Sequence, residues 1–156
     1  SVTVKIPAGV DSGVRLRVAG EGESGESGGA YGDLYVVLHV KESERFVREG
    51  NDLILKYPVS MATAALGAKQ KIQTLEDEKE ITVPAGTQHG ETVVIQGAGV
   101  PSLRGIGRGD LRIQFHVIIP KKLNREQRER LEKFAEIMGE DVSAHAHSGF
   151  FSKLFD

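Results

Sequence analysis

The chain has 156 residues, 39 % hydrophobic and 27 % charged, a composition typical of folded globular proteins rather than disordered ones. Its formal net charge of −2 excludes nucleic-acid or anionic-membrane binding driven by bulk charge. It contains no cysteine, which excludes disulfides and thiolate metal sites, and no apolar run approaches the ~18 residues of a membrane-spanning helix.

Short stretches of alternating apolar and polar residues dominate the first part of the chain and predict β-strands. In residues 34–40, Leu34 and Val36 fall on one face of the strand, whereas Tyr35 and Val37 fall on the other. Residues 111–117 repeat this pattern, and further strands are expected at residues 2–6, 15–19, 52–57, 69–74, 79–83 and 92–96. Gly- and Pro-rich turns separate the strands. The regular spacing favours a mainly β protein made of two small antiparallel β-sandwiches.

Helical signals occur at two places. Residues 60–68 predict a short helical turn closed by Gly67, and residues 125–138 predict a helix with Asn124 as its cap and Gln127 as the capping-box partner. An apolar stripe on this helix consists of Leu131, Phe134, Ala135 and Met138. After a polar linker, a second apolar stripe is formed by Phe150, Phe151, Leu154 and Phe155. Two such stripes exceed what one small sandwich needs to cover, so a homodimer through this C-terminal segment is expected.

The chain contains an internal duplication with a constant offset. Pro7, Gly9 and Gly13 recur 77 positions later (84 − 7, 86 − 9, 90 − 13), and no gap is needed up to the end of the second copy. About half a sandwich precedes the second copy, but almost nothing precedes the first, so the chain is expected to start within its first repeat. The expected parts are an incomplete first β-domain over residues 1–48, a second over 49–121, a helix over 122–139 and a linker with an apolar tail over 140–156.

No catalytic or metal-binding constellation stands out, so an enzyme is not expected. His39 and His116 occupy matched positions on exposed strand faces, and His145 and His147 lie in a polar linker. Asp33 and Asp110 follow glycine at matched strand entrances, where capping of a turn explains both. The Gly-rich stretch at residues 20–29 lies between strands and carries glutamates, which favours a hairpin loop over a phosphate site.

The two copies differ on the outer face of one strand. Tyr35 and Val37 are apolar where the second copy has Arg112 and Gln114. Either a missing part of the domain covers this face, or the face forms a groove for apolar segments of other proteins, with Leu16 and Val18 of the neighbouring strand contributing. Phe46 lies among charged residues and belongs to no alternating apolar pattern. It is therefore either buried under the interdomain connection or exposed as an anchor for binding.

At this point the sequence resembles the C-terminal region of bacterial DnaJ-type co-chaperones. The stretches "VTVKIPAGVDSGVRLRVAGEGESG", "GDLYVVLHV", "FVREGNDL", "AALGA" and "GDLRIQFHV" match that family's pattern over nearly the whole chain. The resemblance implies two client-binding β-sandwiches and a C-terminal dimerisation segment. It also implies a shallow apolar groove where an extended client pairs with a strand edge, lined in part by the phenylalanine at Phe46.

Two family features are missing from this sequence: the His-Pro-Asp motif that stimulates DnaK-type ATPases, and the Cys-x-x-Cys zinc repeats. No cofactor is therefore expected in this segment, and a zinc site of the parent protein would lie outside it. The expected function is a cytoplasmic, stress-related co-chaperone that binds unfolded proteins and delivers them to a DnaK-type partner. The alternative is an adaptor or glycan-binding β-sandwich with one ligand, which the lack of tryptophan disfavours.

Overall fold

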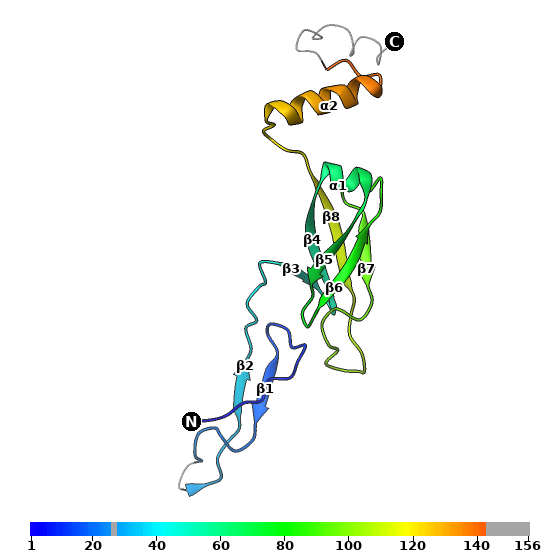
Figure 1. Ribbon diagram of the computed structural model, residues 1–156. Helices are drawn as coiled ribbons and strands as arrows, with labels where there is room; N and C mark the ends of the chain where they lie inside the picture. The colour runs from blue at the N-terminus through cyan, green and yellow to red at the C-terminus, as the bar shows by residue number, and fades with distance from the viewer. Residues whose placement is uncertain (26–27, 143–156) are drawn as a thin grey trace, which may run out of the picture. The chain divides into compact units, whose positions relative to one another are not determined.

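A computed structural model describes residues 1–25 and 28–142, so the predicted apolar stripe at Phe150, Phe151, Leu154 and Phe155 lies outside the described residues. The chain is mainly β with a C-terminal helix, as predicted, and divides into two compact units, residues 1–118 and 119–156 (Figure 1). The elements are β1 (Arg15–Val18), β2 (Leu34–Val37), β3 (Phe46–Glu49), β4 (Asp52–Ser60), α1 (Met61–Leu66), β5 (Ala68–Gln73), β6 (Glu78–Val83), β7 (Thr92–Ile95), β8 (Leu111–Ile118) and α2 (Arg125–Ile137).

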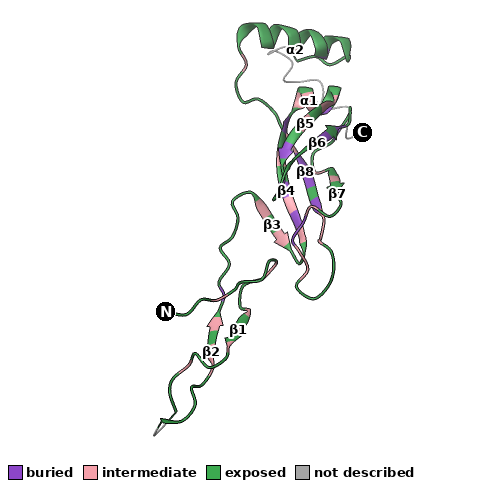
Figure 2. Ribbon diagram, turned by 60° about the horizontal axis from the view of Figure 1, so that its bottom comes forward, coloured by how far each residue is buried: buried purple, intermediate pink, exposed green. Residues whose placement is uncertain are grey.

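A two-layer sandwich holds the core of the first unit. A four-stranded sheet has the order β3-β4-β8-β7, and the β5–β6 hairpin supplies the second layer. Leu111, Ile113 and Phe115 of β8 are at most 1 % exposed and pack with Leu55 of β4 and Ile72 of β5 in one apolar cluster. Figure 2 shows the buried residues concentrated on these strands.

The pairing of β4 with β8 is parallel, which departs from the predicted purely antiparallel arrangement. The remaining strand pairs, including β7–β8 and β5–β6, are antiparallel. Parallel neighbours require a long crossover connection, and the chain provides one by passing through α1, β5, β6 and β7 before it returns as β8.

The helical turn predicted at residues 60–68 is confirmed as α1. The Ser60 side chain accepts a hydrogen bond from the Thr63 backbone N–H, which caps the first turn. Gly67 ends the helix at φ 77°, and a Cβ atom there would lie 2.9 Å from the backbone nitrogen of Ala85. Both the left-handed backbone and the close approach therefore require glycine at this position.

The first copy forms a hairpin in which β1 pairs with β2 in antiparallel register. Leu16 lies opposite Val36 and Val18 lies opposite Leu34, and these four side chains are half-buried on one face. Tyr35 and Val37 are 60 % and 45 % exposed on the other face, so the predicted alternation is confirmed. The strand predicted at residues 2–6 is wrong, because the structure forms no strand there.

The duplication reappears as equivalent hydrogen bonds. The Gly13 N–H donates to Leu38 O at 2.8 Å, and its counterpart Gly90 N–H donates to Phe115 O at 2.7 Å. The Asp33 carboxylate accepts from Gly20 N–H at 3.1 Å, and the Asp110 carboxylate accepts from Gly97 N–H at 2.9 Å. Both aspartates therefore cap a turn, as the sequence predicted.

We expect Asp110→Ala to lower the free energy of unfolding by about 1–2 kcal/mol, because it leaves the Gly97 N–H without its partner. Asp110→Asn keeps an acceptor oxygen and should lose less. Urea unfolding followed by circular dichroism measures both variants. Equal stability of Asp110→Ala and the parent chain would show that water replaces the carboxylate at no cost.

The copies differ in what covers their apolar face. Leu111 and Ile113 of β8 are fully buried beneath the rest of the sandwich, whereas their counterparts Leu34 and Val36 of β2 are only half-buried. Within residues 1–25 and 28–142, no strand pairs with β2 in the way that β4 pairs with β8. The expected boundary between residues 48 and 49 falls inside β3, which the structure places in the sheet of the second copy.

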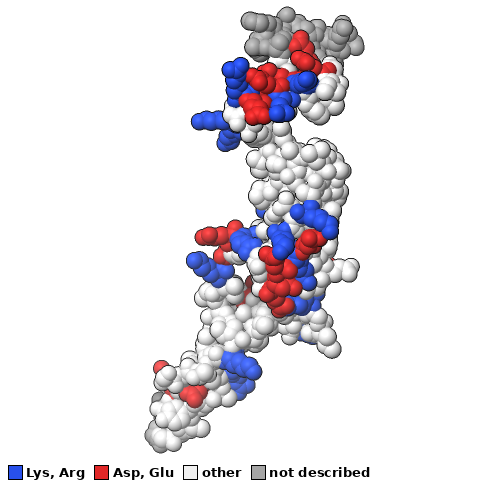
Figure 3. Space-filling view, in the orientation of Figure 1, with Lys and Arg blue, Asp and Glu red and all other residues white. Residues whose placement is uncertain are grey.

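The second unit contains α2, whose capping box is present as predicted. The Asn124 side chain accepts from the Gln127 backbone N–H, and the Gln127 side chain accepts from the Asn124 backbone N–H. Ion pairs four residues apart, such as Arg125–Glu129 and Arg130–Glu126, give α2 the mixed charges visible in Figure 3. No helix of the described residues is long and apolar enough to cross a membrane.

Candidate functional site

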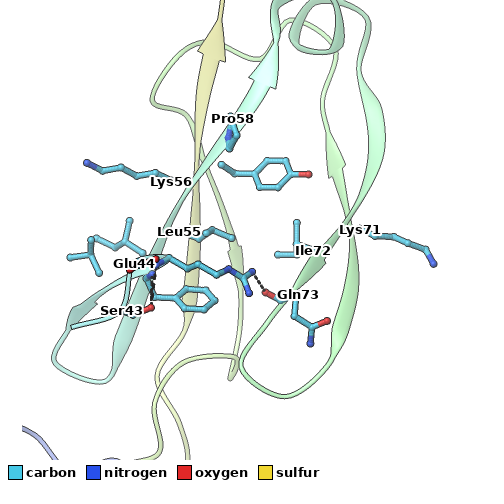
Figure 4. Close-up of a pocket in the computed structure, with 13 residues that line it drawn as sticks. Ser43, Glu44, Leu55, Lys56, Pro58, Lys71, Ile72 and Gln73 are labelled. Carbon is cyan, nitrogen blue, oxygen red and sulfur yellow. Dashed lines mark hydrogen bonds between the residues drawn. The ribbon is translucent and has the colours of Figure 1, made fainter. Parts of the chain in front are cut away.

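A groove of about 630 Å³ runs between the β3–β4 edge of the large sheet and the β5 strand of the hairpin (Figure 4). Its apolar lining includes Phe46 from β3, Leu55 and Tyr57 from β4, and Ile72 from β5. Leu55 and Ile72 are 7 % and 3 % exposed, while Phe46 and Tyr57 are half-buried and pack against the same core. The apolar floor of the groove is thus an uncovered part of the sandwich core.

The outer edge of β5 borders this groove with unpaired backbone groups. Among the described residues, β6 is the strand that pairs with β5, and the opposite edge of β5 pairs with no strand. At the hairpin end, the Thr74 N–H donates to Asp77 O at 2.8 Å, so Thr74 faces β6 and its neighbour Gln73 faces outward. In an antiparallel ladder the orientation alternates, which places the N–H and C=O of Lys71 on the same outer edge. An extended peptide in the groove therefore meets a strand edge that is ready to pair.

The turn that ends β5 is held by side chains. The Thr74 hydroxyl donates to the Asp77 carboxylate at 2.7 Å, and this hydrogen bond, helped by Lys79 at 3.3 Å, lowers the pKa of Asp77. A lowered carboxylate pKa adds stability above the ordinary aspartate range, and this stability is lost as pH falls through the lowered value. Acid pH is therefore expected to weaken this turn, and a change of pH above the ordinary aspartate range is not.

Arg45 connects the two sides of the groove. Its Nη2 donates to the backbone carbonyl of Gln73 at 2.9 Å, which is the dashed line beside Gln73 in Figure 4. Its Cζ lies 5.0 Å from the centre of the Phe46 ring, within the range of a cation–π contact. We call these two contacts the Arg45 bridge. The bridge occupies one of the outward carbonyls of β5 and covers one face of the phenylalanine.

The predicted client-binding residues do not share one surface. Phe46 lines the groove of the second sandwich, whereas the other four lie on the β1–β2 hairpin. Leu16 and Val18 face one side of that hairpin, and Tyr35 and Val37 face the other. The structure thus separates the predicted set into three places, because the register of β1 against β2 puts the two pairs back to back.

Sequence reasoning missed several groove residues. Leu55 and Tyr57 alternate along β4, and this signal placed them in a strand without showing that a groove opens beside them. Ile72 and Arg45 carry no signal of their own, because their proximity comes from the packing of the hairpin on the sheet. Within the described residues, no group of His, Asp or Glu is placed to hold a metal ion, while His145 and His147 lie outside those residues.

The predicted apolar stripe of α2 is exposed in part, and Ala135 within it is buried. Phe134 and Met138 are 57 % and 61 % exposed, and Leu131 is half-buried. A hollow of about 340 Å³ is lined by apolar side chains around Leu131 and Phe134, namely Leu123, Ala135 and Val142. The remaining predicted dimerisation residues, Phe150, Phe151, Leu154 and Phe155, lie outside the described residues.

Comparisons with known proteins agree with this architecture. Residues 1–120 match the model of the DnaJ C terminal domain, and residues 126–154 match that of the chaperone protein DnaJ C-terminal region. Similar proteins named chaperone protein DnaJ occur in Haloferax mediterranei (51 % identical over 98 % of this chain and 39 % of that protein) and Desulfotalea psychrophila (46 % identical over 100 % and 42 %).

A relative of the same name in Streptococcus uberis is 44 % identical over 99 % of this chain and 41 % of that protein. The chain thus spans about two fifths of the length of these relatives, which are named as chaperones. The match covers both β copies and continues into the C-terminal segment. The chain belongs to the DnaJ C-terminal domain family.

Proposed function

We propose that this chain is the client-binding part of a co-chaperone, and that the groove beside Phe46 holds exposed apolar segments of unfolded proteins. The observation that carries the proposal is the combination of an apolar floor and an open strand edge in one groove. Backbone hydrogen bonds to β5 supply affinity for any extended chain, since every peptide has them. The floor then selects apolar side chains, which gain about 1.5–3 kcal/mol each when fully buried.

This arrangement suits a protein that binds many clients. Sequence-independent pairing with a strand edge tolerates different segments, and a shallow apolar floor favours those that a folded protein would bury. Membership of the DnaJ family supports the proposal, because the relatives are named as chaperones. Delivery of the bound client to a DnaK-type chaperone in the cytoplasm is the part of the proposal that rests on family resemblance.

Suppression of aggregation tests this function. At a few-fold molar excess, the intact chain is expected to slow the heat-induced light scattering of several unrelated model proteins. A panel of at least three clients with different folds separates a general holdase from an adaptor. Protection of none of them, or tight binding of a single folded ligand or glycan, would contradict the proposal.

We also propose that the chain forms a homodimer through α2 and the segment that follows it. Support comes from the exposed side chains of Phe134 and Ile137 on a helix of 13 residues, and of Met138 directly after it. Isolated helices of this length are marginal in water, so an apolar stripe on one needs a partner surface. Two grooves in one dimer would bind two segments of the same client, which raises the apparent affinity through effective concentration.

A further inference from the structure

The Arg45 bridge closes the groove at the end of β5. Its two contacts use both the charge and the planar face of one guanidinium group, which donates to Gln73 O at 2.9 Å and lies 5.0 Å from the Phe46 ring centre. An extended segment that pairs along the outer edge of β5 requires the Gln73 carbonyl as an acceptor. Such a segment therefore competes with the guanidinium of Arg45 for this oxygen.

In the Arg45 bridge, the charge is held by a backbone carbonyl and not by a carboxylate. Within the described residues, the Arg45 guanidinium forms no ion pair with a carboxylate. Lys56 and Lys71 also line the groove, and Lys71 already pairs with Glu78 at 3.0 Å. Among the residues that line the groove, Glu44 is acidic and Arg45, Lys56 and Lys71 are basic, and the side chains of Lys56 and Lys71 extend away from the groove in Figure 4.

We propose that Arg45 makes this groove selective for extended apolar segments that carry an aspartate or glutamate next to the stretch that pairs with β5. A carboxylate on the bound segment gives the displaced guanidinium a planar, two-oxygen acceptor, the geometry that arginine matches best. A neutral segment offers no such acceptor, and a segment with lysine at this place meets like charge. The inference deepens the proposed function and rests on it.

The position of the acidic residue follows from the direction of β5. Gln73 is the last residue of β5, so the bridge lies at the C-terminal end of that strand. A segment antiparallel to β5 places its N-terminal flank near Arg45, and a parallel segment places its C-terminal flank there. The flank at which an acidic residue improves binding therefore also reports the orientation of the client.

Fluorescence anisotropy with matched peptides tests the selectivity. One set of labelled peptides shares an apolar core of six residues and carries Asp, Asn or Lys at the N-terminal flank; a second set carries them at the C-terminal flank. In one of the two sets, the intact chain is expected to bind the Asp peptide about fivefold more tightly than the Asn peptide, as an ion pair near the surface contributes up to about 1 kcal/mol. The preference should shrink in high salt.

Arg45→Gln is the informative variant, and Arg104→Gln is its matched control. Arg104 is an exposed arginine outside the groove lining, so its replacement removes the same net charge without touching the bridge. Arg45→Gln is expected to bind the Asp and Asn peptides equally, and to bind the Asn peptide at least as tightly as the parent chain does. Arg104→Gln is expected to keep the preference for Asp.

Two results would overturn the inference while leaving the proposed function intact: equal binding of the Asp and Asn peptides by the parent chain, or an unchanged preference in Arg45→Gln. If the parent chain binds no peptide of either set, the groove itself is not a client site. In that case the proposed function of the groove fails together with the inference.

Discussion

Phe134→Asp is expected to convert a dimeric chain into monomers at tens of micromolar. Phe134 is 57 % exposed in the single chain and adjoins the apolar hollow around Leu131, and the proposed dimer would cover it. Full burial of an aromatic or leucine side chain contributes about 1.5–3 kcal/mol. A carboxylate in the same place loses that contribution and has to be desolvated without a partner. We therefore expect the dimer dissociation constant to rise at least about 100-fold.

Lys133→Asp is the matched control for this prediction. It introduces the same side chain at the neighbouring exposed position, which lies about a quarter of a turn away on the helix surface. Multi-angle light scattering should find a dimer for the parent chain and for Lys133→Asp, and a monomer for Phe134→Asp. Far-ultraviolet circular dichroism should show intact β-structure in all three.

Each contrary outcome of this experiment shows which part of the prediction is wrong. A monomeric parent chain would refute the homodimer. If the chain stays dimeric with Phe134→Asp, the dimer contact lies outside α2 and is expected at Phe150, Phe151, Leu154 and Phe155. Deletion of residues from Glu140 onward would then separate the contribution of α2 from that of the C-terminal segment. Deletion is expected to weaken the dimer in either case, because it removes four of the seven predicted apolar contacts.

Local signals predicted most of the fold. The alternation in β2 and β8, the capping of α1 by Ser60 and the capping box at Asn124 depend on residues a few positions apart, so the sequence alone displays them. β3 was missed because it is four residues long and mixes charged with apolar side chains. It is a strand because Phe46 and Val47 pair with Leu55 and Ile54 of β4, which no local pattern indicates.

Pairing between strands also explains why the candidate site was predicted only in part. The sequence shows that Leu16 and Val18 share a face, and that Tyr35 and Val37 share another. Which of these faces coincide depends on the register, and the structure aligns Leu16 with Val36 rather than with Val37. The sequence marks Phe46 as an apolar residue among charges, and the family resemblance implies a groove beside it. The groove itself depends on β5 lying opposite β3, which no local pattern indicates.

Phe46→Ala is expected to weaken the binding of unfolded protein by at least about tenfold. The ring is the largest apolar side chain of the groove lining, and its partial exposure leaves a face for a bound segment. Phe46 also packs against the core, so truncation should lower the free energy of unfolding by about 1–3 kcal/mol, less than for a fully buried phenylalanine. Truncation is therefore expected to affect both stability and binding, so the binding measurement must be made well below the melting temperature of each variant.

Two further variants separate binding from stability. Phe46→Leu keeps an apolar group against the core and loses the aromatic face, so it should melt close to the parent chain and still bind clients more weakly. Tyr35→Ala removes an aromatic side chain that is 60 % exposed on the β1–β2 hairpin, away from the groove, and should bind like the parent chain. Peptide titration, measured alongside thermal melting, decides whether clients bind in the groove or on the outer face of β2. Normal binding by Phe46→Leu together with weak binding by Tyr35→Ala would place the client site on the outer face of β2.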